Sequence, residues 1–277
     1  MQQIQIQIDY GAYVLDSNKE YHLLNGNLTG CLIAEYLLSQ KQKANTLPSN
    51  GVVITTIVSS NLLGAIAKNY NIKKEDVLTG FKWVGLKMLE LETENKGTFL
   101  FAYEESYGYL VGNEVRDKDA VISAMFLSEI AAFCKANNKT IWDYIIDIYE
   151  KYGYYIEGAD SVWLEGLDGQ AKIKTMMDNL RKNPLFKVGD YRVLSISDYK
   201  ENTSINLETK EITGTGLPNS NVLYYELENN SWLCARPSGT EPKIKFYYGL
   251  KGTSLEDAEN KSLEFKNSLK ELMNSVS

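Results

Sequence analysis

Short apolar runs alternate with amphipathic segments along most of the chain. Residues 51–58 (GVVITTIV) are apolar or β-branched throughout, which predicts a strand buried on both faces. Helical spacing follows, with Leu63, Ile66 and Tyr70 on one face, and a further strand is expected at 98–103 (TFLFAY). Alternation of strands and helices is typical of an α/β domain, which we place at residues 28–150.

Three helices of this predicted domain carry recognisable ends or faces. The first is expected to be capped by Thr29, and the last has Thr140 and Asp143 spaced as a capping box, with Gly153 as its stop. Between them, a helix from about residue 119 to 135 is expected to turn Ile122, Met125, Phe126, Ile130 and Phe133 inward.

Beyond residue 152 the order of elements changes. A strand (154–166) and a helix (168–184) precede strands near 191–196, 222–228, 231–235 and 244–249, and an amphipathic helix begins at Ser254. Strands grouped between helices predict a small α+β domain at residues 151–277, which we expect to be TBP-like. The predicted fold class is therefore α/β, with a mixed α/β domain followed by an α+β domain.

The first residues differ from both domains. Residues 1–27 alternate with period two from the start, as a sheet interior does. We expect them to be remnant strands of a preceding α/β domain that is truncated here.

Composition narrows the function classes. The net charge of −7 argues against broad nucleic-acid binding, which needs a basic surface. Three widely spaced cysteines suit a reducing compartment and show no metal-type spacing. Neither a membrane span nor a leader pattern is recognisable, so we expect a cytoplasmic protein without membrane partners.

Residues 236–242 (RPSGTEP) are the most distinctive short stretch. Arg236 offers a planar fork of donors that matches phosphate oxygens. Ser238 and Thr240 add hydroxyls, and Gly239 allows a backbone N–H to approach closely. The stretch predicts phosphate binding, but Pro, Ser and Gly also suit an ordinary turn between strands.

A second polar stretch, YEESYG, follows the predicted strand 98–103. Strand alternation would place Glu104 and Ser106 on one side and Glu105 on the other. A carboxylate and a hydroxyl so placed could hold vicinal sugar hydroxyls. The alternative is a solvated loop.

Four other residues have chemistry worth weighing. Lys82 lies between two glycines and could contact phosphate, transfer a proton, or be a surface lysine in a turn. Asp117 and Asp119 resemble a metal pair, but Asp119 fits better as a helix cap. His22, the single histidine, has no obvious partner and is expected to be structural.

The stretches TGFKWVG, YEESYGYLVGNEVRDKDA and ARPSGTEPKIKFYYG, in this order, resemble the second half of the α-D-phosphohexomutases, the phosphoglucomutase and phosphomannomutase family. The resemblance covers nearly the whole chain: the end of domain 2, then domains 3 and 4. It implies that Glu104 and Ser106 contact sugar hydroxyls. It also implies that Arg236, Ser238, Gly239 and Thr240 grip the phosphate that is not being transferred, and places Lys82 near the active site.

The chain departs from the family in two motifs. Neither the Thr-Ala-Ser-His-Asn-Pro stretch of the nucleophilic serine nor the Asp-x-Asp-x-Asp-Arg magnesium loop is present. The resemblance implies Mg²⁺ and glucose 1,6-bisphosphate as cofactors of the full-length enzyme. Because this chain is expected to hold no metal site and no catalytic residue other than the candidate Lys82, we expect it to be inactive alone.

Two functions stay open. The first is the C-terminal part of a mutase (an isomerase acting by intramolecular phosphotransfer between C1 and C6 of hexose phosphates), whose partner is the missing N-terminal half. The alternative is a stand-alone sugar-phosphate binding module or complementing subunit. A nucleic-acid binder is disfavoured by the acidic balance.

Overall fold

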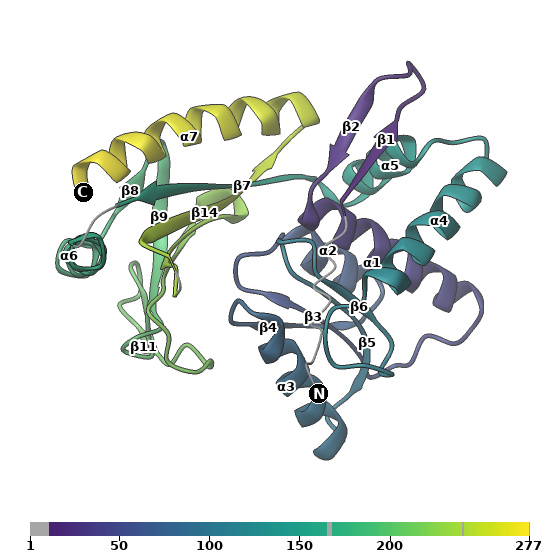
Figure 1. Ribbon diagram of the computed structural model, residues 1–277, viewed down its shortest axis with the longest axis horizontal. Helices are drawn as coiled ribbons and strands as arrows, with labels where there is room; N and C mark the ends of the chain where they lie inside the picture. The colour runs from purple at the N-terminus through teal and green to yellow at the C-terminus, as the bar shows by residue number, and fades with distance from the viewer. Residues whose placement is uncertain (1–10, 165–167, 240, 277) are drawn as a thin grey trace. The chain divides into compact units, whose positions relative to one another are not determined.

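The computed structural model describes residues 11–164, 168–239 and 241–276, and these fall into two compact units that divide between Gly153 and Tyr154. Each unit has its own sheet, as the colouring by residue number in Figure 1 makes plain. The units are described separately below.

The first unit is built on a four-stranded sheet in the order β4-β3-β5-β6. Strand β3 (Gly51–Thr56) pairs in parallel with β4 (Lys73–Val77) and β5 (Thr98–Tyr103), and β6 (Tyr109–Val111) is antiparallel to β5. Every residue of β3 is buried, which confirms the prediction from its unbroken apolar run.

Helices cover both faces of this sheet. Helix α3 (Phe81–Thr93) packs Phe81, Val84 and Met88 against Val52 and Ile54 of β3. On the other face, α1 (Gly26–Lys43) approaches Tyr103 so closely that a Cβ at Gly30 would lie 2.4 Å from the ring. The remaining helices are α2 (Leu62–Asn69), α4 (Ala120–Ala136) and α5 (Ile141–Tyr152).

The helix ends confirm some sequence predictions and correct others. Thr140 and Asp143 form the expected capping box, and Gly153 ends α5 with φ 108°. The cap of α1 is Asn25, whose side chain accepts a hydrogen bond from the N–H of Leu28, and not Thr29, which is buried inside the helix. In α4, Met125 is exposed although an inward position was expected.

The inward face of α4 is centred on Leu127, Ile130 and Cys134, of which Ile130 was predicted. Mean apolarity is high all around this helix, so spacing alone misplaced the face by part of a turn. Among the described residues no individual helix is long and apolar enough to cross a membrane. Only α4 and α5 taken together, bent by 88° at their junction, would pass by length and composition.

A two-stranded hairpin precedes α1. Strand β1 (Ala12–Leu15) pairs antiparallel with β2 (Tyr21–Leu24), and residues 1–10 of the predicted remnant strands lie outside the described residues. One face of the hairpin exposes four large apolar side chains: Tyr13, Leu15, Tyr21 and Leu23. The opposite face carries His22, whose ring stacks on Trp142 at 3.8 Å and whose Nε2 lies 3.2 Å from Asp16, two partners that the sequence did not reveal.

The second unit is a small α+β structure with an eight-stranded antiparallel sheet. Its main order is β11-β10-β9-β12-β13-β14-β7, and β8 pairs with β9. The strands are β7 (Tyr154–Trp163), β8 (Lys187–Val188), β9 (Tyr191–Asp198), β10 (Thr203–Asn206), β11 (Ile212–Thr213), β12 (Leu223–Leu227), β13 (Ser231–Pro237) and β14 (Lys243–Gly252). The short strands β8, β10 and β11 were not predicted.

Helices α6 (Gly169–Lys182) and α7 (Leu255–Val276) share one core with the sheet. Buried Met176, Phe265 and Leu269 pack against alternate residues of the strands, among them Leu233 and Phe246. The predicted mixed α/β fold followed by an α+β fold is confirmed. Its TBP-like character stays a prediction.

Candidate functional site

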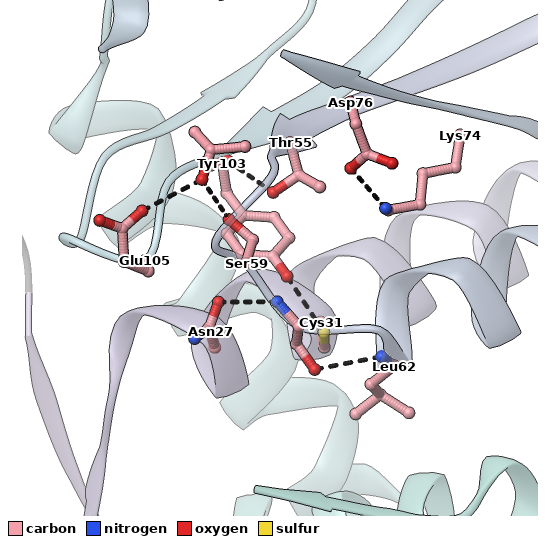
Figure 2. A network of polar contacts seen from close by, with 11 residues as sticks. Asn27, Cys31, Thr55, Ser59, Leu62, Lys74, Asp76, Tyr103 and Glu105 are labelled. Carbon is pink, nitrogen blue, oxygen red and sulfur yellow. Dashed lines mark hydrogen bonds and ion pairs between the residues drawn. The ribbon is translucent and has the colours of Figure 1, made fainter. Parts of the chain in front are cut away.

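The carboxyl ends of the parallel strands in the first unit gather polar side chains. Thr56, the last residue of β3, lies 2.9 Å from the hydroxyl of Ser59 and donates a hydrogen bond of 3.2 Å to Glu105, which follows β5. Figure 2 shows Ser59 and Glu105 in this network, with Asn27 of α1 nearby. In open α/β sheets the carboxyl edge is where ligands bind.

Hydrogen bonds from α1 and from the start of α2 stabilise the same edge. The side-chain oxygen of Asn27 accepts a hydrogen bond of 3.1 Å from the N–H of Ser60, and the hydroxyl of Ser60 accepts one of 3.1 Å from the N–H of Leu62. Ser60 therefore serves the start of α2, although Asn61 occupies the N-cap position. Sequence reasoning missed Asn27 and Thr56. For Thr56 the end of a buried strand was the available signal.

Glu104 is the best-fixed carboxylate of this edge. Its side chain is buried, and Oε1 accepts a hydrogen bond of 2.7 Å from the N–H of Gly80, the N-cap of α3. The positive end of a helix favours negative charge, so this position stabilises an ionised carboxylate. Gly80 has φ 113°, a conformation that other residues rarely adopt, which explains glycine there.

The segment after Glu104 is a tight turn and not a continued strand. Strand β5 ends at Tyr103, the N–H of Glu104 donates to the carbonyl of Gly108 at 2.8 Å, and Tyr107 has φ 67°. Ser106 is exposed, whereas Glu104 is buried. The alternation argument that put both on one side was therefore wrong, because it assumed extended backbone. Their contact with sugar hydroxyls stays a prediction.

Lys82 lies in the first turn of α3, two residues after the N-cap that holds Glu104. Its side chain is exposed, and Nζ lies 5.1 Å from the ring centroid of Trp83, within reach of a cation–π contact. Because Glu104 accepts a hydrogen bond from Gly80, two residues before Lys82, the Glu104 turn lies next to the first turn of α3, which carries Lys82. Its role in phosphate contact or proton transfer stays a prediction.

The predicted phosphate loop connects β13 to β14 in the second unit. Arg236 and Pro237 end β13, and the N–H of Ser238 donates a hydrogen bond of 2.8 Å to the carbonyl of Lys243. The hydroxyl of Ser238 accepts from the N–H of Glu241 at 3.3 Å. Gly239 is exposed, and Thr240 lies outside the described residues. The loop is a narrow connection closed by its own backbone.

Two lysines that sequence reasoning did not select flank this loop. Lys245 is the cross-strand partner of Arg236, which places both on the same face of the sheet. Lys243 pairs with Glu241 at 2.6 Å, and its Nζ lies 4.2 Å from the ring of Trp163. The alternation Lys-Ile-Lys after the loop was the available signal. Three cationic side chains therefore start from the two strands that carry the loop.

Metal binding can be tested against the described residues. Asp119 caps α4 by accepting a hydrogen bond of 3.0 Å from the N–H of Ile122, as predicted. Asp16, Glu20 and His22 have ligand atoms within 4.8 Å of one another. This group does not fit Mg²⁺, which prefers six oxygen ligands, because one donor is a nitrogen and Asp16 already accepts from two backbone N–H groups.

Comparison with known proteins gives concordant results. Residues 25–152 match the family model of the phosphoglucomutase/phosphomannomutase α/β/α domain III. The chain is 34% identical over 241 residues to a phosphoglucomutase of Staphylococcus haemolyticus, covering 87% of this chain and 43% of that protein. A Staphylococcus aureus phosphoglucomutase is 34% identical over 251 residues, covering 91% and 44%.

Solved structures share the fold at low identity. A putative phosphomannomutase of Thermus thermophilus has a TM-score of 0.56 at 14% identity, covering 91% of this chain and 41% of its own. The open form of parafusin, a phosphoglucomutase of Paramecium, gives 0.56 at 15%, covering 90% and 42%. These structural similarities show that the chain has the fold of the sugar-phosphate mutases.

These matches confirm the resemblance to the α-D-phosphohexomutase family that the sequence motifs predicted. The chain spans somewhat under half the length of the curated relatives, 43% of the Staphylococcus haemolyticus protein.

Proposed function

We propose that this chain supplies the sugar-binding and phosphate-binding parts of a phosphoglucomutase or phosphomannomutase. The reaction would be phosphoryl transfer between C1 and C6 of a hexose phosphate. The loop from Arg236 to Thr240 would hold the phosphate that is not being transferred, and Glu104 and Ser106 would hold sugar hydroxyls.

The placement of Arg236 is the observation that carries the proposal. It ends a central strand, directly beside Lys245 on the neighbouring strand and next to the Ser238 turn. A guanidinium fork with a nearby ammonium is suited to a phosphate dianion. An ordinary hairpin turn would not need two cations on the same sheet face.

Glu104 supports the sugar-binding part of the proposal. Its carboxylate is held by Gly80 at the sheet edge where ligands bind, so little ordering is left to be done when a hydroxyl donates to it. A neutral polyol has hydroxyl donors that a charged acceptor binds well. The neighbouring Lys82 would contribute positive charge at the same edge.

Turnover would need groups that we do not assign to this chain. A bound Mg²⁺ would neutralise charge on the phosphoryl group during transfer, and a phosphoserine would donate it. Glucose 1,6-bisphosphate would serve as the activating cofactor of the whole enzyme. We propose that the phosphoserine and the Mg²⁺ site belong to an N-terminal half. The exposed apolar face of the β1–β2 hairpin offers a contact surface for that half.

Titration of glucose 1-phosphate into the purified chain tests the proposal. Binding should be saturable, should be lost in Arg236→Ala, and should persist in Arg192→Ala, which removes an exposed arginine of β9. A mutase assay with Mg²⁺ and glucose 1,6-bisphosphate should show no turnover by the chain alone. Equal binding by both arginine variants would overturn the assignment of the phosphate loop.

The alternative, a stand-alone sugar-phosphate module or complementing subunit, makes a different forecast. A module would bind at full affinity without any second chain. A mutase part should gain affinity and turnover when the N-terminal half of a related mutase is added. Turnover by the chain alone would contradict both accounts.

A further inference from the structure

We propose that the first unit carries a second anion site, which binds a small, multiply charged phosphate compound. The site, here called the lysine pocket, is a cavity of about 570 Å³ lined by Lys68, Lys73, Lys74 and Lys96. That volume lies within the range of small-molecule sites.

The lysine pocket lies at the edge of the sheet opposite to Glu104. Gly51 and Lys73, which begin β3 and β4, line it, together with Lys96, which precedes β5. The candidate sugar-binding residues follow the carboxyl ends of the same strands. The two sites therefore share no residue, and occupation of one leaves the other accessible.

Charge is what sets this cavity apart. Its lining within the described part of the chain has four lysines and neither aspartate nor glutamate. Three lysines are partnered by carboxylates outside the lining: Lys73 by Glu75, Lys74 by Asp76, and Lys96 by both Glu94 and Glu90. The side chains of Lys73 and Lys96 are exposed, and ion pairs at exposed positions are worth little, so an anion can compete for these two ammonium groups.

Lys68 is the least committed of the four. It forms no ion pair with any described residue, although its place in the last turn of α2 also complements the helix dipole. Lys74, by contrast, is held in place: its side chain is only 19% exposed, and it lies over Gly64 of α2. One cation without an ion pair among the described residues and one fixed cation, both facing the same cavity, suit an anion larger than a single ion.

Neutral donors complete the lining. The side-chain oxygen of Asn50 accepts a hydrogen bond of 3.0 Å from Thr98, which leaves its NH₂ group as a donor, and Asn71 adds a second amide. Lysines with amide donors match phosphate oxygens. The volume of the cavity and the net charge of −7 favour a compact ligand such as a pyrophosphate or bisphosphate ester over an extended nucleic acid.

Titration with inorganic pyrophosphate at low salt tests this site. The whole chain is used in an Arg236→Ala background, so that the candidate phosphate loop cannot contribute. We expect saturable shifts of the backbone amide signals of Gly64 and Asn71 in NMR spectra. The double variant Lys68→Gln/Lys74→Gln should weaken binding about tenfold or more.

A matched double variant, Lys174→Gln/Lys270→Gln, removes the same charge from the exposed faces of α6 and α7 and should leave binding unchanged. Urea midpoints of all variants would show that they remain folded. No saturable shift at Gly64 and Asn71, or equal weakening in both double variants, would overturn the proposal. Loss of glucose 1-phosphate binding in Arg236→Ala has no bearing on it, so the two proposals fail separately.

Discussion

The carboxylate of Glu35 in α1 accepts a hydrogen bond of 2.8 Å from the hydroxyl of Tyr152, the last residue of α5. Tyr70, at the end of α2, donates to the same carboxylate at 2.9 Å, and Lys151 lies 3.3 Å away. One buried side chain thus joins three helices of the first unit. Its charge is tolerated because each oxygen has a donor.

Glu35→Leu should destabilise the first unit by about 2–3 kcal/mol, because two tyrosine hydroxyls would lose their acceptor in a buried place. Glu35→Gln should cost less, since its amide oxygen still accepts a hydrogen bond. Urea unfolding followed by circular dichroism measures both. An unchanged midpoint in Glu35→Leu would show that the three helices do not depend on this contact.

Alkaline pH should destabilise the same region. Burial, together with the hydrogen bond to Glu129, raises the pKa of Tyr36 to about 12, and burial raises the pKa of Tyr144 and Tyr152. A tyrosine that keeps its proton longer when folded contributes stability that is full below about pH 10. This stability is lost as the pH rises toward the folded pKa.

Urea midpoints should therefore fall between about pH 10 and about pH 12. Tyr36→Phe should reduce the steepness of that fall, because its ring cannot ionise. Tyr21→Phe, which changes an exposed ring, is the control and should follow the unmodified chain. The same steepness in all three proteins would refute a role for Tyr36.

Two helix glycines should respond to alanine in opposite ways. A Cβ at Gly30 would lie 2.4 Å from the ring of Tyr103, so Gly30→Ala should destabilise by about 1–3 kcal/mol through overpacking. A Cβ at Gly64 would meet only the Lys74 side chain, at an ordinary van der Waals distance of 3.6 Å. Gly64→Ala should therefore stabilise by about 0.5–1 kcal/mol. Thermal unfolding measures both, and the same sign for both would contradict the close approach of α1 to Tyr103.

Glu104→Gln should weaken glucose 1-phosphate binding about tenfold while leaving the fold intact. The amide oxygen can still accept from the N–H of Gly80, so only the charge is removed. Calorimetric titration compares it with Glu259→Gln on the exposed face of α7. Unchanged affinity in Glu104→Gln would contradict the proposal that the Glu104 carboxylate is the main acceptor for the sugar hydroxyls.

Local sequence predicted those features that local physics decides. The buried strand 51–56, the Thr140–Asp143 capping box and the Gly153 stop depend on a few neighbouring residues, and all were recovered. The phosphate-loop prediction rested on residue types that are unusual together, from Arg236 onward. None of these needed knowledge of which elements pack together.

Features set by distant contacts were missed. Trp142 and Tyr152, the partners that α5 supplies to His22 and Glu35, lie more than a hundred residues further along the chain, and no spacing reveals them. Glu104 and Ser106 were misplaced because the chain turns at Tyr103, where strand alternation stops applying. Asn25 caps α1 because the chain leaves β2 just before it, which hydrophobic spacing does not report.

The hydrogen bond from Gly80 to Glu104 ties the start of α3 to the β5–β6 turn, and Trp83 lies within that first turn of α3. A sugar that donates a hydrogen bond to the Glu104 carboxylate would therefore alter the surroundings of the Trp83 indole, which lies three residues from Gly80. The chain thus has a built-in optical probe at this edge, and tryptophan emission would report occupancy without any attached label.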